Sequence, residues 1–350
     1  MKGKLFNILV TVFVMGFMCQ VATAGEIVVN CDGGTNLETF KKTMFKPFEK
    51  ATGHKIIYDP GANFAKLRAM VKSGNVEWDL AEAWSQDLVI KLGREGVLEE
   101  IDYSVVGSGL YGVNKEDLYT AVVTKWGVGD GFYSTVIGYN TEKFPAGKEP
   151  KSWKDFWNVE KFPGPRALQK GPWGNLEFAL LADGVPLEKL YPLDVERALK
   201  SMDKIKKHVK VWWESGAQPV QLLNDREVDM TSIWNGRIYM MIKDGAKVGI
   251  QWNQAFLMAS AWVVPKGAKN KKLAMELIQW CMKPEPQARH AEIIGYPGIN
   301  KKLYDYMDKK YAVILPTYPA NYEVAVLPNY DWWIENRDKV TEQWNAWILK

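Results

Sequence analysis

The sequence predicts an α/β fold with mainly parallel sheets flanked by helices, arranged as two domains. Strand-like and helix-like patterns alternate along the chain from residue 26 onward, which is typical of β-α units. The chain has 350 residues, and about 326 remain after a predicted leader of 24 residues. That length is sufficient for two domains of ordinary size.

The first half of the chain repeats the β-α pattern three times. The predicted elements are strands at 26–30, 55–58, 78–83 and 136–140 and helices at 40–51, 64–72 and 86–96. The segment 127–131 is rich in glycine and does not match a dinucleotide-binding motif, so it predicts a mobile turn.

The second half resumes the same alternation without a long flexible linker. The predicted elements are helices at 153–157, 176–182, 192–208 and 270–282 and strands at 167–169, 229–234 and 261–265. Because no linker separates the halves, we expect the domains to be joined by strands that cross between them.

The amino terminus has the pattern of a secretory signal peptide. Lys2 and Lys4 precede an apolar stretch at 5–18, and small residues follow at 22–24. The apolar stretch is shorter than the roughly 20 residues of a membrane-spanning helix. We therefore expect cleavage after Ala24 and a soluble mature protein in the periplasm.

Charge and cysteine content exclude several classes of protein. The net charge of +4 falls to about +2 once Lys2 and Lys4 are removed, so nothing favours binding of nucleic acid or of a membrane surface. The mature chain keeps only Cys31 and Cys281, too few for a disulfide framework. Two buried free thiols are favoured over a disulfide between them.

Catalytic and metal-binding motifs are missing from the sequence. His54, His208 and His290 are far apart and do not have the spacing of a helical metal site. There is no G-x-S-x-G segment and no phosphate-binding P-loop. We therefore expect no metal, no cofactor and no enzymatic activity.

Aromatic side chains are abundant near the predicted strand ends. The chain has 16 tryptophans, and Trp84, Trp234 and Trp252 lie at or just beyond such ends. Ligands of open α/β sheets bind outside the carboxyl ends of the strands, where an aromatic ring stacks on the ligand. These three tryptophans are predicted to contact a ligand, whereas core packing is the more common role of any other tryptophan.

Several segments resemble the periplasmic binding proteins of the spermidine/putrescine type. They are Ser232-Ile-Trp-Asn-Gly-Arg237, Trp252, the run 261–270, and Ile294-Gly-Tyr-Pro-Gly-Ile-Asn300. The resemblance covers nearly all of the mature chain. It implies a type II fold of two lobes with a hinge between them, and an ABC importer, with its permease and ATPase subunits, as the partner of a monomeric binding protein.

The resemblance also implies domain boundaries. The chain is expected to cross between lobes near Gly138 and Ala261. Lobe 1 then comprises 25–138 and 261–307, and lobe 2 comprises 139–260 and 308–350.

The sequence departs from the polyamine-binding pattern where carboxylates are expected to hold ligand amines. Ser260 stands where such relatives have an acid just before the strand at 261. The acidic pair after the strand at 167–169 is replaced by Lys170, Gly171 and Gly174. The loop 32–35 also lacks the aromatic residues of polyamine binders.

Arg237 favours a different ligand, because a guanidinium offers a planar fork to a carboxylate. The Trp234-x-x-Arg237 arrangement is similar to that of relatives that bind γ-aminobutyrate, although Ser260 replaces their amine-binding acid. We therefore expect a small carboxylate or amino-acid-like anion. The candidate ligand-binding residues are Arg237, Trp234, Trp84, Ser85, Tyr133, Ser134, Trp252, Ser260, Lys170, Trp173 and Thr35.

Other interpretations remain open at this point. Arg237 could form a surface or interlobe ion pair, and a solvated side chain is the more common state of a lysine such as Lys170. Polyamine binding is the alternative ligand class. Ferric-ion capture would require adjacent tyrosines, which the chain lacks. An exported enzyme on the same scaffold would be recognised by turnover of its ligand.

Overall fold

The computed structural model describes residues 24–350. The predicted signal peptide, residues 1–24, lies outside the described residues except for Ala24. None of the helices in the described part is both long and apolar enough to cross a membrane.

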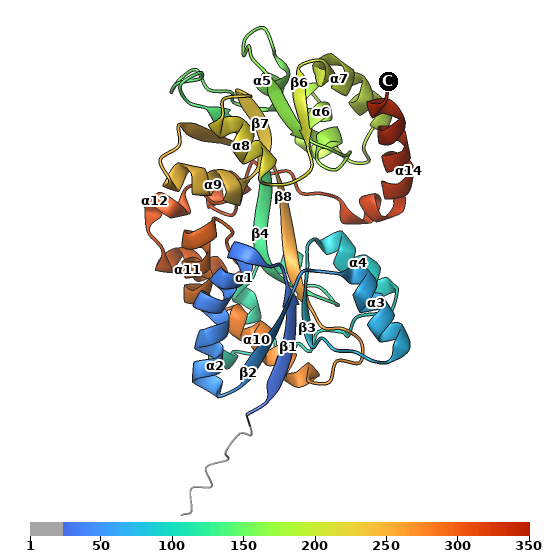
Figure 1. Cartoon of the computed structure of the whole chain (residues 1–350), viewed down its shortest axis with the longest axis vertical. Helices are drawn as coiled ribbons and strands as arrows, with labels where there is room; N and C mark the ends of the chain where they lie inside the picture. The colour runs from blue at the N-terminus through green and yellow to red at the C-terminus, as the bar shows by residue number, and fades with distance from the viewer. Residues whose placement is uncertain (1–23) are drawn as a thin grey trace, which may run out of the picture.

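Two α/β lobes are joined by two long strands (Figure 1). These strands, β4 (Val128–Asn140) and β8 (Val248–Val263), are antiparallel and pair along most of their length. Through them, the strands of both lobes form one hydrogen-bonded series in the order β2-β1-β3-β8-β4-β7-β5-β6. The predicted α/β fold of two lobes is therefore confirmed.

Lobe 1 is the lower lobe in Figure 1 and contains a parallel arrangement of β2, β1 and β3. Its strands are β1 (Glu26–Cys31), β2 (Lys55–Pro60) and β3 (Leu80–Ala83). Its helices are α1 (Gly34–Phe40), the π-helical segment η1 (Lys41–Phe45), α2 (Lys46–Thr52), α3 (Phe64–Ser73), α4 (Gln86–Arg94), α10 (Lys271–Cys281) and α11 (Pro284–Ile294). The helix predicted at 40–51 is thus part of a longer one that begins at Gly34.

Lobe 2 is the upper lobe, with β7, β5 and β6 parallel to one another. Its strands are β5 (Arg166–Gln169), β6 (Val209–Trp213) and β7 (Met230–Trp234). Its helices are α5 (Trp153–Trp157), α6 (Asn175–Ala182), α7 (Val195–Lys206), α8 (Gln218–Asn224), α9 (Asn235–Lys243) and α14 (Tyr330–Ile348).

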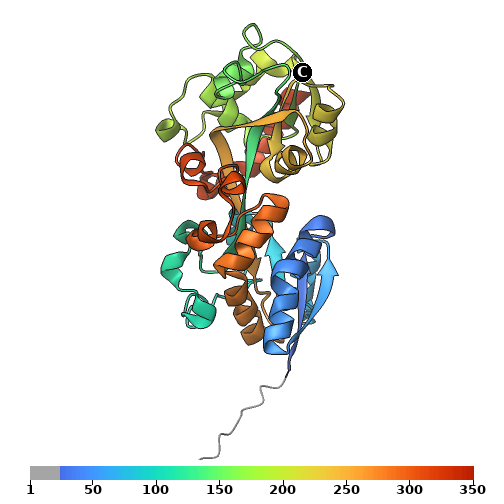
Figure 2. The same cartoon turned by 90° about the vertical axis from the view of Figure 1, so that its left-hand side faces the viewer.

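Shorter helices occupy the connections. Between α11 and α14 the chain forms η6 (Lys301–Tyr306), α12 (Lys309–Ala312) and α13 (Pro319–Tyr322). Further 3₁₀ turns are η2 (Leu110–Gly112), η3 (Lys115–Asp117), η4 (Thr120–Val122) and η5 (Leu187–Lys189). Figure 2 shows α11 and the segments that follow it lying beside the two crossing strands.

The expectation of a mobile turn at 127–131 is wrong, because β4 begins at Val128 and includes most of this segment. A Cβ at Gly129 would lie 2.7 Å from a methyl carbon of Val122 and 2.8 Å from one of Ile299. The glycine therefore allows close packing inside a strand rather than a flexible turn. The strands predicted at 136–140 and 261–265 likewise cover only the carboxyl-terminal parts of β4 and β8.

Each lobe has its own hydrophobic core. In lobe 1, Phe40 packs against Trp262 of β8, with 5.2 Å between ring centroids. In lobe 2, the rings of Trp153 and Phe178 are stacked at 3.6 Å. The two cysteines, Cys31 and Cys281, lie buried in the lobe 1 core and are not bonded to each other, as the sequence favours.

A buried carboxyl group ties α14 to the rest of lobe 2. Glu177 of α6 is fully buried, and its Oε1 accepts hydrogen bonds from Tyr191 Oη at 2.5 Å and from Trp333 Nε1 at 2.8 Å. Burial raises the pKa of Glu177 to about 7 despite these hydrogen bonds. The Glu177 carboxyl group therefore stays protonated in the folded protein at pH values at which it has already lost its proton in the unfolded chain.

Stability should depend on pH through Glu177. Because its folded-state pKa is raised, the associated stability is lost as the pH rises from about 5 through 7. Glu177→Gln keeps an acceptor for Trp333 and cannot ionise. We expect this variant to exceed the wild type in unfolding free energy by roughly 3 kcal/mol at pH 8 and by less than about 1 kcal/mol at pH 5.

Urea denaturation at the two pH values measures this difference. Glu188→Gln, at an exposed position, serves as the control and should change neither value. A Glu177→Gln effect of the same size at both pH values would contradict the linkage.

Candidate functional site

The carboxyl ends of strands from both lobes converge on the middle of the crossing strands. β7 is antiparallel to β4, and its last residue, Trp234, pairs with Thr135. β5 and β6 run parallel to β7, so their carboxyl ends point the same way. From lobe 1, β3 ends at Ala83, opposite Ala261 of β8. Ligands of α/β folds bind at such strand ends, which makes this interlobe region the candidate site.

Arg237 and Trp234 lie together on the lobe 2 side of the region. Arg237 is in the first turn of α9, is exposed, and makes no hydrogen bond or ion pair with any residue in the range 24–350. Trp234 precedes α9 and is half-buried, with its ring edge-to-face on Trp213 at 5.6 Å. The region therefore presents a free planar cation beside an aromatic ring.

Asn235 fixes the start of α9. Its side chain is fully buried, its Oδ1 accepts a hydrogen bond from the backbone N–H of Ser134 at 2.7 Å, and its Nδ2 donates to the carbonyl of Gly295 at 2.7 Å. One side chain thus joins α9 to β4 and to the segment after α11. Tyr296 follows in that segment, near Arg237. Burial raises the pKa of Tyr296 to about 12, although the charge of Arg237 acts in the opposite direction.

Trp84 presents an aromatic surface from lobe 1, directly after β3. Its side chain is 46% exposed, and its Nε1 donates to Asp32 Oδ1 at 3.1 Å. The ring of Phe64 packs edge-to-face against it at 5.2 Å. Thr35, in the first turn of α1, is also exposed on this lobe.

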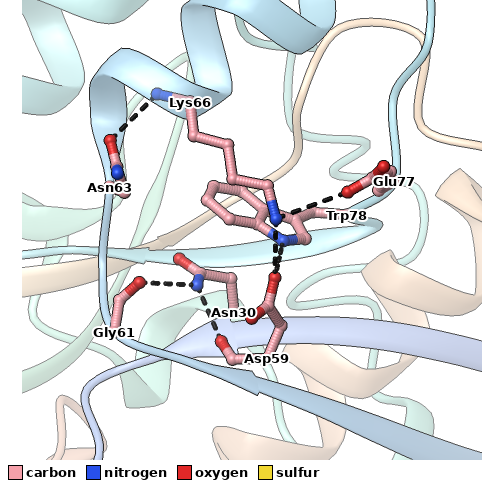
Figure 3. A network of polar contacts seen from close by, with 7 residues as sticks. All are labelled: Asn30, Asp59, Gly61, Asn63, Lys66, Glu77 and Trp78. Atoms are coloured by element: carbon pink, nitrogen blue, oxygen red, sulfur yellow. Dashed lines mark hydrogen bonds and ion pairs between the residues drawn. The ribbon is translucent and has the colours of Figure 1, made fainter.

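A polar network holds the start of α3 (Figure 3). This start of α3 also carries Phe64, whose ring supports Trp84. Asp59 Oδ2 accepts hydrogen bonds from Trp78 Nε1 at 2.6 Å and from Lys66 Nζ at 3.1 Å. The buried Asn30 donates to the carbonyl of Asp59 at 2.7 Å. These contacts fix the loop between β2 and α3 at the carboxyl edge of the lobe 1 strands.

Tyr133 joins the crossing strand β4 to lobe 1. Its hydroxyl donates to the carbonyl of Trp84 at 3.0 Å. The next residue, Ser134, is only 1% exposed. The Ser134 hydroxyl is enclosed and has no hydrogen-bond partner among residues 24–350, and its contact with a ligand stays a prediction.

Ser85 takes part in a bridge between the lobes. Its Oγ donates to Asp87 Oδ1 at 2.5 Å, and Asp87 forms an ion pair with Arg337 of α14 at 2.7 Å. A second ion pair joins Arg94 of α4 to Asp331 of α14 at 3.0 Å. The α4–α14 contact is therefore electrostatic and connects the lobes beside the crossing strands.

Three carboxyl groups lie close together in lobe 1, at Asp32, Glu82 and Asp130. Glu82 Oε2 accepts a hydrogen bond from the backbone N–H of Asp32 at 3.0 Å. Burial and the neighbouring acids raise the pKa of Glu82 well above its usual value. Burial raises the pKa of Asp130 to about 6, although the nearby hydroxyl of Ser260 acts in the opposite direction. Acids therefore lie beside Ser260, where the sequence indicated none.

No group of three or more His, Cys, Asp or Glu residues in the described part of the chain has an arrangement that could hold a metal ion.

Three other predicted contact residues are engaged elsewhere. Lys170 Nζ pairs with Glu214 Oε1 at 2.8 Å on the surface. The face of Trp173 is covered by the guanidinium of Arg337, 4.5 Å from the ring centroid. Trp252 is not at a strand end as predicted, because it lies within β8 and packs against the lobe 2 core.

Sequence reasoning missed three residues that shape the region: Tyr296, Asn235 and Gly216. Tyr296 and Asn235 belong to segments that carry the family resemblance, which is the signal that could have identified them. Gly216 lies in an undistinguished loop after β6, and only the structure places it against Trp234 and Arg237.

Comparison with known proteins identifies the family of this chain. Residues 43–322 match the model of the bacterial extracellular solute-binding protein family. The chain belongs to this family. Since the match spans most of the chain, the resemblance seen in the sequence is confirmed.

Individual relatives cover nearly the whole chain. A γ-aminobutyric acid-binding protein of Pseudomonas aeruginosa is 34% identical over 94% of this chain and 92% of its own length. The spermidine/putrescine-binding periplasmic protein of Escherichia coli is 24% identical over 88% and 89%. The crystal structure of an ABC transporter substrate-binding protein from Bradyrhizobium japonicum is 35% identical and superposes with a TM-score of 0.85, covering 92% of this chain and 99% of that one.

The contact between Tyr133 and Trp84 gives a prediction for this solute-binding protein. Tyr133→Phe removes the hydrogen bond to the Trp84 carbonyl, which is worth about 1 kcal/mol. We expect the amides of residues 84–86 to exchange with deuterium about fivefold faster in this variant.

Hydrogen exchange with mass spectrometry measures the effect. Tyr139→Phe is the matched control, because Tyr139 is on the same strand and its hydroxyl makes no hydrogen bond to residues 24–350. Equal exchange in the wild type and Tyr133→Phe would show that the hydrogen bond does not restrain this turn.

Proposed function

We propose that the protein is the substrate-binding component of an ABC importer and captures a small carboxylate or amino-acid-like anion between its lobes. The observation that carries this proposal is the free guanidinium of Arg237 beside Trp234. The exposed arginines Arg94, Arg226 and Arg289 each have a carboxylate partner. The absence of such a partner among residues 24–350 leaves its planar fork available for a ligand carboxylate.

The charges around the region favour an anionic group at Arg237 over a polyamine. A polyamine would bring ammonium groups close to a guanidinium in a site from which water is partly excluded, and like charges repel strongly there. The acids at Asp32, Glu82 and Asp130 are the feature that favours an amine elsewhere in the ligand. An amino acid whose carboxylate and amine are well separated could place its carboxylate at Arg237 and its amine near these acids. One relative is named for γ-aminobutyrate.

Ligand capture would close the lobes around the crossing strands. A ligand that contacts Arg237 of lobe 2 and Trp84 of lobe 1 only when the lobes approach stabilises the closed form, which is the signal that an importer reads. We retain the predicted lobes 25–138 with 261–307 and 139–260 with 308–350. The pairing of β4 with β7, which begins at Thr135, favours a crossing a few residues before Gly138.

The same proposal implies the location and the partners of the protein. The predicted signal peptide would deliver a monomeric protein to the periplasm, where it passes the ligand to the permease of an importer whose ATPase subunits drive transport. In this role the protein returns its ligand chemically unchanged and needs no cofactor.

Arg237→Ala tests the proposal by isothermal calorimetry. The ligand is first chosen by thermal-shift screening with γ-aminobutyrate, other amino acids, aliphatic and aromatic carboxylates, putrescine and spermidine, because a ligand specific to the folded state raises its melting temperature. We expect Arg237→Ala to weaken carboxylate binding about 100-fold or more, or roughly 3 kcal/mol. The melting temperature of the empty protein should stay nearly unchanged, since Arg237 is exposed.

Arg289→Ala, an exposed arginine on α11, is the matched control and should bind like the wild type. Unchanged affinity in Arg237→Ala would refute the carboxylate anchor. A thermal shift with putrescine or spermidine alone would replace the proposal with polyamine binding.

A further inference from the structure

Gly216 occupies a position where the chain has no conformational need for glycine. It lies in the loop between β6 and α8, and it is absent from the residues with positive φ, so any amino acid could adopt its backbone conformation. It is buried, although Ser215 and Ala217 on either side are exposed. Glycine is therefore required at this position because its neighbours leave no room for a side chain.

The volume that a side chain at position 216 would need is occupied by Trp234 and Arg237, the two side chains of the proposed anion site. A Cβ at position 216 would lie 2.7 Å from two ring atoms of Trp234 and 3.1 Å from Nε of Arg237. The 2.7 Å distances are too short for a carbon atom and the 3.1 Å distance is tight, so an alanine here would displace the Trp234 ring and press on the guanidinium of Arg237.

Gly236 shows the same relation on the other side of Arg237. It lies in the first turn of α9, where alanine would normally be preferred to glycine by about 1 kcal/mol. A Cβ at this position would lie 2.3 Å and 2.5 Å from ring atoms of Tyr296 and 2.7 Å from the carbonyl oxygen of Ile294. The missing methyl group therefore allows the Tyr296 ring to approach α9 beside Arg237.

Packing is what orients the guanidinium in the empty protein. Arginine side chains are commonly aligned by hydrogen bonds to carboxylates or carbonyls, but Arg237 has no such acceptor within residues 24–350. Its Nε instead lies against the backbone of Gly216, next to the ring of Trp234. A guanidinium held in this way has its outer nitrogens free for a ligand.

We infer that Gly216 and Gly236 are positioning residues, which set Arg237 and its flanking rings Trp234 and Tyr296 in the geometry that accepts a carboxylate. This inference rests on the proposed role of Arg237. It predicts that one added methyl group at position 216 lowers the affinity for the anion without direct contact with the ligand.

A thermodynamic cycle with Gly216→Ala, Arg237→Ala and the double variant tests the inference, with γ-aminobutyrate as the probe in calorimetry. We expect Gly216→Ala to weaken binding about tenfold, because a bidentate pair loses its alignment. In the Arg237→Ala background the same substitution should have almost no further effect, since the group that Gly216 positions is gone. Fully additive losses would contradict positioning through Arg237.

Gly33→Ala is the matched control. Gly33 has φ of −82°, and a Cβ there would meet only Pro60 Cβ at 3.6 Å, an ordinary contact. This variant should bind like the wild type. Calorimetric stoichiometry reports the competent fraction, so partial misfolding of Gly216→Ala does not mimic lost affinity.

A crystal structure of empty Gly216→Ala provides a test that needs no ligand. Displacement of the Trp234 ring or of the Arg237 guanidinium is the expected result. Unmoved side chains around a well-ordered new methyl group would overturn the inference even if Arg237→Ala abolishes binding. Normal binding by Arg237→Ala, with displaced side chains in Gly216→Ala, would instead refute the proposed anchor and leave the packing relation intact.

Discussion

The backbone ladder between β4 and β8 is the constraint on which the rest of the structure depends. These two strands belong to both lobes, and every other strand is placed by its pairing to one of them or to a neighbour. The register shifts between Gly129 and Gly131 and between Thr135 and Ile137, which indicates bulges that bend and twist the ladder near the interlobe region. The positions of Trp84 and Arg237 follow from this register.

Side-chain hydrogen bonds hold the residues of the candidate site in fixed positions relative to β4. The hydroxyl of Tyr133, on β4, donates a hydrogen bond to the Trp84 carbonyl in the turn after β3. The side chain of Asn235, the first residue of α9, accepts a hydrogen bond from the backbone of β4. Any motion of one lobe about the crossing strands therefore moves the Trp84 side of the region relative to the Arg237 side. The ion pairs between α4 and α14 lie beside the same strands and limit which motions are possible.

The two lobes offer opposite electrostatic environments to a ligand. Lobe 2 presents the free cation of Arg237, whereas lobe 1 holds acids whose pKa values are raised by burial and would be lowered by a ligand amine, so that the acids ionise beside it. A guanidinium that is hydrated in the open protein gains a stronger interaction when closure removes water around its carboxylate partner. A dipolar ligand fits this asymmetry better than a ligand of uniform positive charge.

The sequence was sufficient to predict the α/β alternation, because the strand-like runs at 26–30 and 229–234 are short and each is followed by a helix. It was not sufficient for the length of β4 and β8, since Gly129 looks like a turn until Val122 and Ile299 are seen against it. Long-range contacts account for the surroundings of the candidate site residues that the sequence did not indicate. Lys170 pairs with Glu214, which is 44 residues away in the chain, and Trp173 is covered by Arg337 of the last helix. Neither pairing has a local signal, whereas the motif around Trp234 and Arg237 was identifiable because its residues are close in sequence.

The most direct measurement of the central claim is a crystal structure of the protein with bound γ-aminobutyrate. We predict that the ligand carboxylate lies about 3 Å from both terminal nitrogens of Arg237, with Trp84 of the other lobe closed over the ligand. A ligand carboxylate bound by other groups, with Arg237 still facing solvent, would contradict the assignment of Arg237 as the anchor.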